Sequence, residues 1–117
     1  MIEKDLIVIG GGAAGMSSGI FASRLGLNTL ILEQLMPGGQ VINSENIEDY
    51  PGFPEGISGA ELAAKMQEQA MANGVNVELS EVTSISPKDN EWIVQTTNGP
   101  KSSKTIIIAG GSSLRKL

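Results

Sequence analysis

A short apolar run followed by a glycine-rich turn restricts the fold of this chain more than any other feature. Gly10, Gly12 and Gly15 have GxGxxG spacing, directly follow the apolar residues Leu6–Ile9, and precede a run of small and apolar residues. A strand, a glycine turn and a helix in this order are typical of the first β-α-β unit of a dinucleotide-binding fold. We therefore predict an α/β protein with a parallel sheet.

Each glycine of this motif meets a separate steric demand. Gly10 allows a tight turn out of the strand, Gly12 lets a diphosphate approach the backbone, and Gly15 lets the helix pack closely on the strand. The amides of the first helical turn, including Ala13 and Ala14, and the positive end of the helix dipole would then face the phosphates. A tight turn without a ligand is the alternative explanation. The strand, the helix and the acidic residue described next favour a phosphate site.

A carboxylate ends the second predicted strand, Thr29–Leu32. Glu33 stands where an acidic residue accepts hydrogen bonds from ribose hydroxyls, and its charge would repel a 2′-phosphate. We include its neighbour Gln34 among the candidate cofactor-binding residues. The motif thus disfavours NADP at this site and does not by itself choose between NAD and FAD.

The rest of the chain alternates helix and strand before it changes character. The first helix is predicted over Ala13–Leu25, with Gly19 and Gly26 where it approaches the sheet. The second begins at Ser58, which has capping-box spacing with Glu61, and ends at Asn73-Gly74. The predicted strands are Leu6–Ile9, Thr29–Leu32, Val75–Leu79, Val82–Ser86, Trp92–Thr97, a short strand near Ser102, and Lys104–Ala109.

This order predicts a Rossmann-like FAD/NAD(P)-binding three-layer fold with a parallel sheet and a small antiparallel β insert. We place the insert at about residues 82–103 and assign residues 1–117 to the N-terminal portion of one nucleotide-binding domain. The closing elements of a doubly wound sheet do not occur in the sequence, so we expect the fold to be incomplete on its C-terminal side. An open edge and an apolar face would favour self-association.

Composition excludes several classes of function. The formal net charge of −5 makes nucleic acid and anionic membranes poor partners. No apolar run reaches the roughly 20 residues that span a bilayer, and the first strand begins too early for a signal peptide, which predicts a cytoplasmic protein. Cysteine and histidine are absent. The chain therefore offers no thiolate, imidazole base, disulfide or Cys/His metal site, and we predict no catalytic or metal-binding residue.

The long segment from Gln34 to Gly56 points to one cofactor. Its motifs MPGGQ (Met36–Gln40) and ENIEDYPGFPEGISGAEL (Glu45–Leu62), together with VIGGGAAGMSSG and IIIAGG, resemble the N-terminal part of bacterial low-molecular-weight thioredoxin reductases. These belong to the pyridine nucleotide-disulfide oxidoreductases, and the resemblance covers essentially the whole chain. It implies the FAD domain of a two-domain flavoenzyme whose flavin passes electrons from NADPH to a cysteine pair that reduces thioredoxin. The NADPH domain and the cysteines would lie outside these 117 residues.

The resemblance also implies which residues lie beside the cofactor. Gly38, Gly39 and Gln40 would lie against the flavin ring, where the glycines expose the backbone and the glutamine can donate and accept hydrogen bonds. Asp49 stands where the family most often has Asn, so a charge replaces an amide donor. The other implied contacts are Ala109 and Gly111, with Gly110 between them in place of the usual Thr, and the backbone of Val82 beside the adenine.

These residues also have structural explanations that the sequence leaves open. The loop would then be an ordinary surface excursion, residues 109–111 a turn after a strand, and Val82 a buried strand residue. For Tyr50 and Phe53 we favour packing over flavin stacking. Trp92 is expected to pack in the insert.

Three functions are consistent with these observations. The first is the FAD-binding portion of a thioredoxin-reductase-like flavoprotein, inactive as an isolated chain. The second is a non-catalytic dinucleotide-binding module, or one piece of a split protein. The third is a ferredoxin–NADP reductase of the thioredoxin-reductase type.

Overall fold

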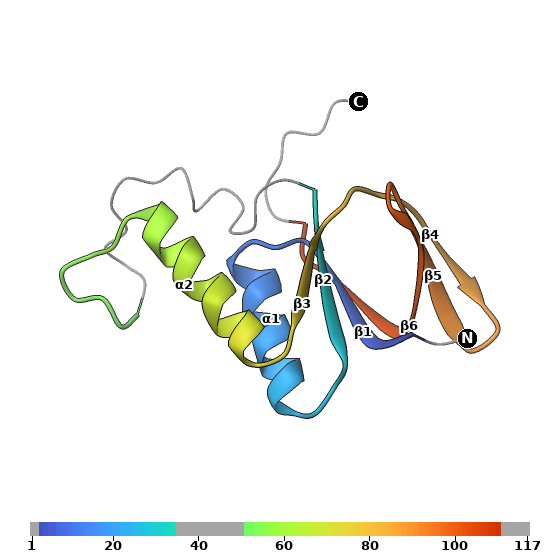
Figure 1. Ribbon diagram of the computed structural model, residues 1–117, viewed down its shortest axis with the longest axis horizontal. Helices are drawn as coiled ribbons and strands as arrows, with labels where there is room; N and C mark the ends of the chain where they lie inside the picture. Colours follow the sequence, from blue (N-terminus) through green and yellow to red (C-terminus); the bar gives the residue numbers. More distant parts are fainter. Residues whose placement is uncertain (1–2, 35–50, 111–117) are drawn as a thin grey trace.

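The computed structural model describes residues 3–34 and 51–110, and the structural statements below concern these residues. Six strands form one sheet in the order β3-β2-β1-β6-β5-β4, and two helices lie side by side against it (Figure 1). The elements are β1 (Lys4–Ile9), α1 (Ala13–Arg24), β2 (Thr29–Glu33), α2 (Gly59–Ala72), β3 (Asn76–Leu79), β4 (Val82–Lys88), β5 (Glu91–Thr96) and β6 (Gly99–Ile108).

The first four strands of this order form the parallel part of the sheet. β2 pairs in parallel with both β1 and β3, and β6 pairs in parallel with the other edge of β1. β1 and β2 are almost continuously apolar, because both of their faces are covered. The predicted Rossmann-like α/β architecture is confirmed.

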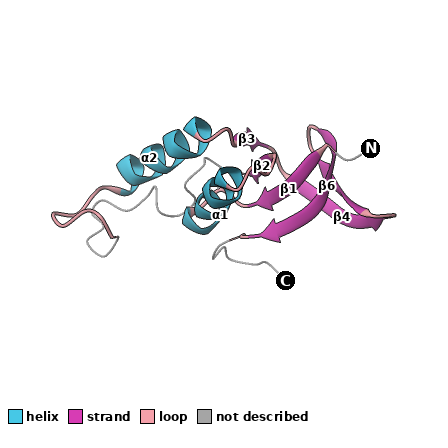
Figure 2. Ribbon diagram, turned by 90° about the horizontal axis from the view of Figure 1, so that it is seen from below, coloured by secondary structure: helices cyan, strands magenta, loops and turns pink. Residues whose placement is uncertain are grey.

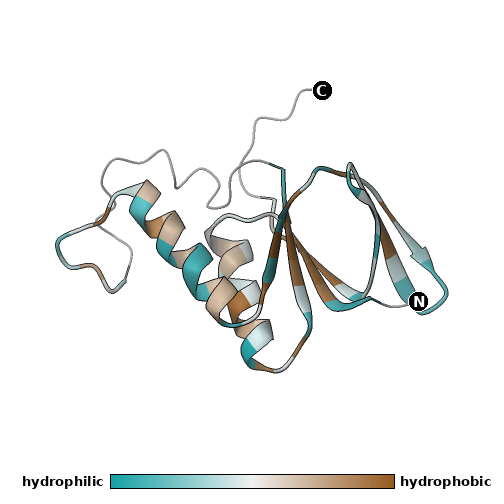
Figure 3. Cartoon of the chain, viewed as in Figure 1, coloured by the Kyte–Doolittle hydropathy of each residue, from teal (hydrophilic) through white to brown (hydrophobic). Residues whose placement is uncertain are grey.

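Alternate residues of the central strands supply two cores. Leu6, Val8 and Ile31 face the helices and pack with buried residues of α1 and α2. Their neighbours Ile7 and Leu32 face the opposite side of the sheet. This period of two follows from the pleat of a β-strand, and Figure 3 shows the apolar colouring that runs along the central strands and the helices.

The antiparallel insert is the third layer. β4 pairs with β5, and β5 pairs with the first half of β6. The buried side chain of Val94 in β5 packs against Ile7, Leu30 and Leu32, so the insert covers the face of the parallel sheet that the helices leave open. In Figure 2 the helices lie at one end of the view and β4 at the other, with β1 and β6 between them.

One predicted boundary was wrong. The sequence predicted a short strand near Ser102 and a separate strand over Lys104–Ala109, whereas the structure has one ten-residue strand, β6. β5 pairs with β6 as far as Ser103, and β1 pairs with it from Ser103 onward. Beyond its first two residues β6 contains no glycine or proline, so nothing interrupts the extended backbone as it passes from one partner to the next.

Two smaller differences concern turns. β4 continues through Pro87 to Lys88, which an edge strand tolerates because its outer N–H groups need no partner. Gly26 does not lie at a helix–sheet contact, since a Cβ there would meet no atom within 4 Å. Its φ of +87° shows that it is needed for the left-handed backbone that follows α1.

The second helix begins as predicted. Ser58 is its N-cap, and the Ser58 side chain accepts a hydrogen bond from the Glu61 N–H at 3.2 Å. Its buried residues Leu62, Met66 and Ala70 recur at helical spacing and face α1 and the sheet. Among the described residues, no helix has the length and apolar character that crossing a membrane requires.

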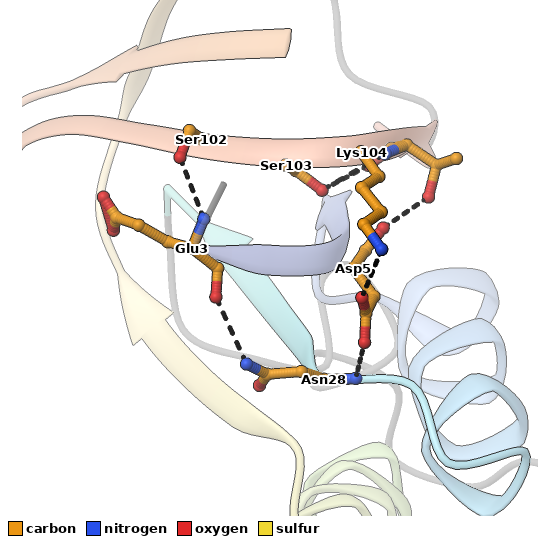
Figure 4. A network of polar contacts seen from close by, with 7 residues as sticks. Glu3, Asp5, Asn28, Ser102, Ser103 and Lys104 are labelled. Carbon is orange, nitrogen blue, oxygen red and sulfur yellow. Dashed lines mark hydrogen bonds and ion pairs between the residues drawn. The ribbon is translucent and has the colours of Figure 1, made fainter. Parts of the chain in front are cut away.

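Polar contacts fix the start of β1 to both of its neighbours (Figure 4). The Asp5 carboxylate accepts the Asn28 N–H at 2.8 Å, and the Thr105 hydroxyl donates to the Asp5 carbonyl at 2.7 Å. The Glu3 N–H donates to the Ser102 hydroxyl at 3.0 Å. These contacts join the start of β1 to the residue before β2 and to the middle of β6, and therefore help to align the carboxyl ends of the three strands.

Replacement of Asp5 tests which part of this network matters. Asp5→Ala is expected to lower the free energy of unfolding by about 1 kcal/mol, because the Asn28 N–H loses its acceptor. Asp5→Asn should cost clearly less, since an amide oxygen can still accept that bond. The remaining ion pair, with Lys104 Nζ at 3.7 Å, is too exposed to contribute much. Urea unfolding measures both; equal losses would show that the charge matters rather than the hydrogen bond.

Candidate dinucleotide-binding site

The candidate site lies where the strand connections reverse direction. From β1 the chain crosses through α1 to β2 on one side, whereas β6 lies on the other side of β1. Ligands of open α/β sheets bind in the crevice at the carboxyl ends of strands at such a switch point. Here those ends carry the glycine loop after β1 and residues 109–110 after β6.

Gly10 lies directly against the end of β6. A Cβ on Gly10 would be 2.0 Å from the Ala109 carbonyl oxygen, and its φ of +114° is one that residues with a side chain rarely adopt. Two backbone hydrogen bonds hold this junction, from Gly10 N–H to the Leu32 carbonyl and from Ala109 N–H to the Ile9 carbonyl, both 2.8 Å. Gly10 and Ala109, both predicted from the sequence, thus lie together.

The first turn of α1 follows at once. Gly12 is the N-cap, the helix begins at Ala13, and the Met16 N–H donates to the Gly12 carbonyl at 2.9 Å. A Cβ on Gly15 would be 1.8 Å from the Gly10 carbonyl oxygen, so the helix can approach the strand this closely only with glycine there. Ala14 is exposed at the same end.

The amino end of α1 carries no compensating negative charge in its first turn, and no side-chain hydrogen bond caps it in the described part of the chain. The first N–H groups of a helix have no partner within the helix, and they carry the positive end of its dipole. This arrangement suits a diphosphate, which supplies both acceptor oxygens and negative charge.

Glu33 turns its carboxylate toward the glycine loop. Its Oε2 accepts the Gly11 N–H at 2.7 Å, and its Oε1 accepts the Gln34 N–H at 2.8 Å. The side chain is half-buried, while Gln34 is exposed. The carboxylate therefore stands beside the proposed diphosphate position and not away from it.

Gly11 is a residue of this site that the sequence reasoning missed. Its amide holds the Glu33 carboxylate, and a Cβ on Gly11 would be 3.0 Å from Glu33 Cβ. The sequence signal for it was that the position between Gly10 and Gly12 is also glycine, which the GxGxxG spacing does not require.

The other predicted residues are less informative. Val82 is half-buried and packs with the apolar cluster on the insert side of the sheet, as a strand residue would. Phe53 packs against the helix-side core, and Trp92 pairs within the insert but remains 39% exposed. The predictions for Gly38, Gly39, Gln40, Asp49, Tyr50 and Gly111 lie outside the described residues.

The chemistry of the site is that of binding. The chain has no cysteine or histidine, and the described residues contain no group of three acidic side chains that could hold a metal ion. What lies together is a bare glycine turn, a helix amino end and one carboxylate. These groups can hold a phosphorylated ribose.

Comparison with known proteins identifies the family. The pyridine nucleotide-disulphide oxidoreductase family matches residues 4–117. The chain belongs to this family. Thioredoxin reductase from Treponema pallidum is 38% identical over 115 residues, which are 98% of the chain and 38% of that protein. A 34.2 kDa protein of the rubredoxin operon of Clostridium pasteurianum is 43% identical over 116 residues, which are 98% of the chain and 37% of that protein.

Solved structures agree with this assignment. Thioredoxin reductase from Lactococcus lactis superposes with a TM-score of 0.90 at 39% identity, and the match covers 98% of the chain and 38% of that structure. A thioredoxin reductase from Gloeobacter violaceus gives a TM-score of 0.92 at 26% identity, covering 100% and 39%. The chain thus spans little more than a third of the length of these pyridine nucleotide-disulphide oxidoreductases.

Two glycine substitutions test the packing of the loop. Gly15→Ala is expected to lower the free energy of unfolding by more than about 2 kcal/mol, because the new methyl group overlaps a backbone carbonyl that cannot retreat. Gly110→Ala is the matched control: no atom of the described residues lies within 4 Å of the added Cβ and its φ is not positive, so a change within about 0.5 kcal/mol is expected. Chemical denaturation measures both, and similar values would contradict the close contact.

Proposed function

We propose that this chain is the FAD-binding portion of a thioredoxin-reductase-like flavoprotein. Membership of the pyridine nucleotide-disulphide oxidoreductase family implies a flavin cofactor, and the relatives named thioredoxin reductase cover the chain almost completely. The observation that carries the proposal is the position of Glu33, whose carboxylate lies beside the glycine loop at the carboxyl end of the sheet.

The residues present fit an ADP moiety. The amides at the start of α1, from Gly12 to Gly15, would bind the diphosphate. The diphosphate can come close to this backbone because the loop consists of glycine and alanine. Glu33 would accept the ribose hydroxyls, with Gly11 orienting its carboxylate. Ala109 and Val82 would border the cofactor on the β6 and insert sides.

When bound, the flavin would accept a hydride from NADPH and pass the electrons to a disulfide, since such chemistry belongs to the cofactor. The role of this chain is to bind and orient the ADP end of FAD and to fix the position of the flavin ring. Gly38, Gly39, Gln40, Asp49 and Gly111 are proposed to contact the rest of the cofactor. NADPH and thioredoxin are proposed as the reductant and the partner of the complete protein.

The alternative functions differ in what lies beyond this chain. A non-catalytic dinucleotide-binding module would use the same Glu33 and glycine loop without a second domain. A ferredoxin–NADP reductase of the same architecture would lack the cysteine pair. Relatives named thioredoxin reductase, at 36–38% identity, favour the disulfide reductase.

Self-association of the isolated chain is also proposed. α1 and β6 border an apolar groove of about 590 Å³, and the described residues that line it are all uncharged. Phe21 and Leu25, which line it, are each 69% exposed, and Ile107 of β6, which also lines it, is 39% exposed. A contiguous apolar surface of this kind favours association of two copies.

Light scattering over a range of protein concentrations tests this self-association, and a strictly monomeric chain would contradict it.

Glu33→Gln tests the ribose contact. The affinities for ADP and for FAD are expected to fall about tenfold, because a charged acceptor is replaced by a neutral amide. ADP carrying a 2′-phosphate should bind the wild-type chain more weakly than ADP does, and the gap should narrow in the variant as the repulsion is removed. Isothermal titration calorimetry measures these affinities.

Glu68→Gln provides the control, since Glu68 is an exposed residue of α2 far along the chain from the site and loses the same charge. It should bind all three ligands like the wild type. Equal affinities for Glu33→Gln and wild type would remove the support for the proposed function.

A further inference from the structure

The turn between β5 and β6 is hydrogen-bonded to the residues that follow β3. The Thr97 N–H donates to the Glu81 carbonyl at 3.0 Å, and the Glu81 N–H donates to the Thr97 hydroxyl at 3.2 Å. Next to this pair, the Asn98 side-chain amide donates to the Leu79 carbonyl at 3.4 Å. Thr97 and Asn98 of the turn therefore hold Leu79 and Glu81.

A salt bridge adds a further contact between β6 and β3. Lys101 Nζ in β6 lies 3.4 Å from Glu78 Oε1 in β3, with both side chains less than one-third exposed. The hairpin therefore contacts the chain from Glu78 to Glu81, and we call these four residues the crossing segment. The crossing segment passes directly next to the end of β2.

The crossing segment is bonded to the residue that carries the candidate ribose carboxylate. The Ser80 N–H donates to the Glu33 carbonyl at 2.8 Å, and Glu33 in turn accepts the Gly11 N–H. A continuous path of hydrogen bonds and short chain links thus runs from Thr97 through Glu81, Ser80 and Glu33 to Gly11. It joins the insert to the glycine loop.

The turn that presents Thr97 is itself held in one shape. The buried Thr96 hydroxyl accepts the Asn98 N–H at 3.0 Å and donates to the Gly99 carbonyl at 2.7 Å. Gly99 has a φ of +102°, which suits its place after a tight hairpin turn. A turn held in one shape presents the Thr97 hydroxyl and amide to Glu81 in one position.

We propose that the β5–β6 turn positions the cofactor site from the far side of the sheet, with Thr97 as the positioning residue. This inference rests on the proposed function, because it concerns how Glu33 is held for the ribose. Within the described residues, the hydrogen bonds given above join Thr97 to Glu81 and not to Glu33 or the glycine loop. It acts by fixing Glu81, and through Ser80 it fixes the backbone of Glu33.

Thr97→Val removes the hydroxyl with little change in shape, and Thr97→Ser keeps it. Thr97→Val is expected to weaken binding of ADP and FAD by the same factor, about threefold to tenfold, since both share the ribose that Glu33 holds. Thr97→Ser should restore wild-type affinity. The matched control is Thr105→Val, which loses a hydrogen bond of 2.7 Å to the Asp5 carbonyl near the start of β1 and should leave both affinities unchanged.

Amide hydrogen exchange of the ligand-free chain gives a second readout. Thr97→Val should speed exchange at the Ser80 and Gly11 amides while leaving the Val8 amide in the middle of β1 unchanged. General loss of stability would instead speed exchange at all three. Unaltered affinity and unaltered exchange in Thr97→Val would overturn the inference, whereas a wild-type chain that binds neither ADP nor FAD would overturn the proposed function itself.

Discussion

The contact between Gly10 and the carbonyl of Ala109 is the constraint on which the site depends. β1 and β6 are neighbouring parallel strands, so the backbone leaves both strands at the same edge of the sheet. The residues that follow the two strands therefore come very close to each other. Because a Cβ on Gly10 would come within 2.0 Å of the carbonyl oxygen, only glycine lets β1 end there. The same turn then sets where α1 begins and requires a second glycine, Gly15, against the carbonyl of Gly10. The bare amides that suit a diphosphate are a consequence of this packing.

The insert contributes to the site although it lies on the other face of the sheet. β6 serves both halves of the structure, pairing with β5 up to Ser103 and with β1 from Ser103 onward. The insert therefore shares with the parallel sheet the strand β6, which leads directly into Ala109. It also covers the second apolar face through Val94 and reaches the end of β2 through Thr97 and the crossing segment. Glu33 is thus bonded both to the glycine loop before α1 and to the crossing segment that the insert contacts.

Much of this arrangement could be predicted from local sequence patterns. The glycine spacing predicted the turn, the carboxylate at the end of β2 predicted the position of Glu33, and Ser58 with Glu61 predicted the start of α2. Each of these depends on neighbours within a few residues. The roles assigned to Gly38, Gly39, Gln40, Asp49 and Gly111 remain predictions.

The errors had a different physical origin. Local patterns separated the end of the insert from the last strand, because a change of pairing partner at Ser103 leaves no mark in composition. Gly26 was assigned to a close contact, although the left-handed backbone after α1 is what requires it. The bonds from Gly11 to Glu33 and from Glu81 to Thr97 join residues far apart in sequence. Local sequence patterns do not show which residues form such bonds.

The central claim is that the ADP end of a dinucleotide binds across the start of α1, next to the Glu33 carboxylate. The most direct test is an NMR titration of the ¹⁵N-labelled chain with ADP. The account predicts that the largest shifts occur at the amides of residues 11–15 and at Gln34, and that they saturate together. Shifts concentrated on the outer face of α2, or none at the glycine loop at saturating ADP, would contradict it.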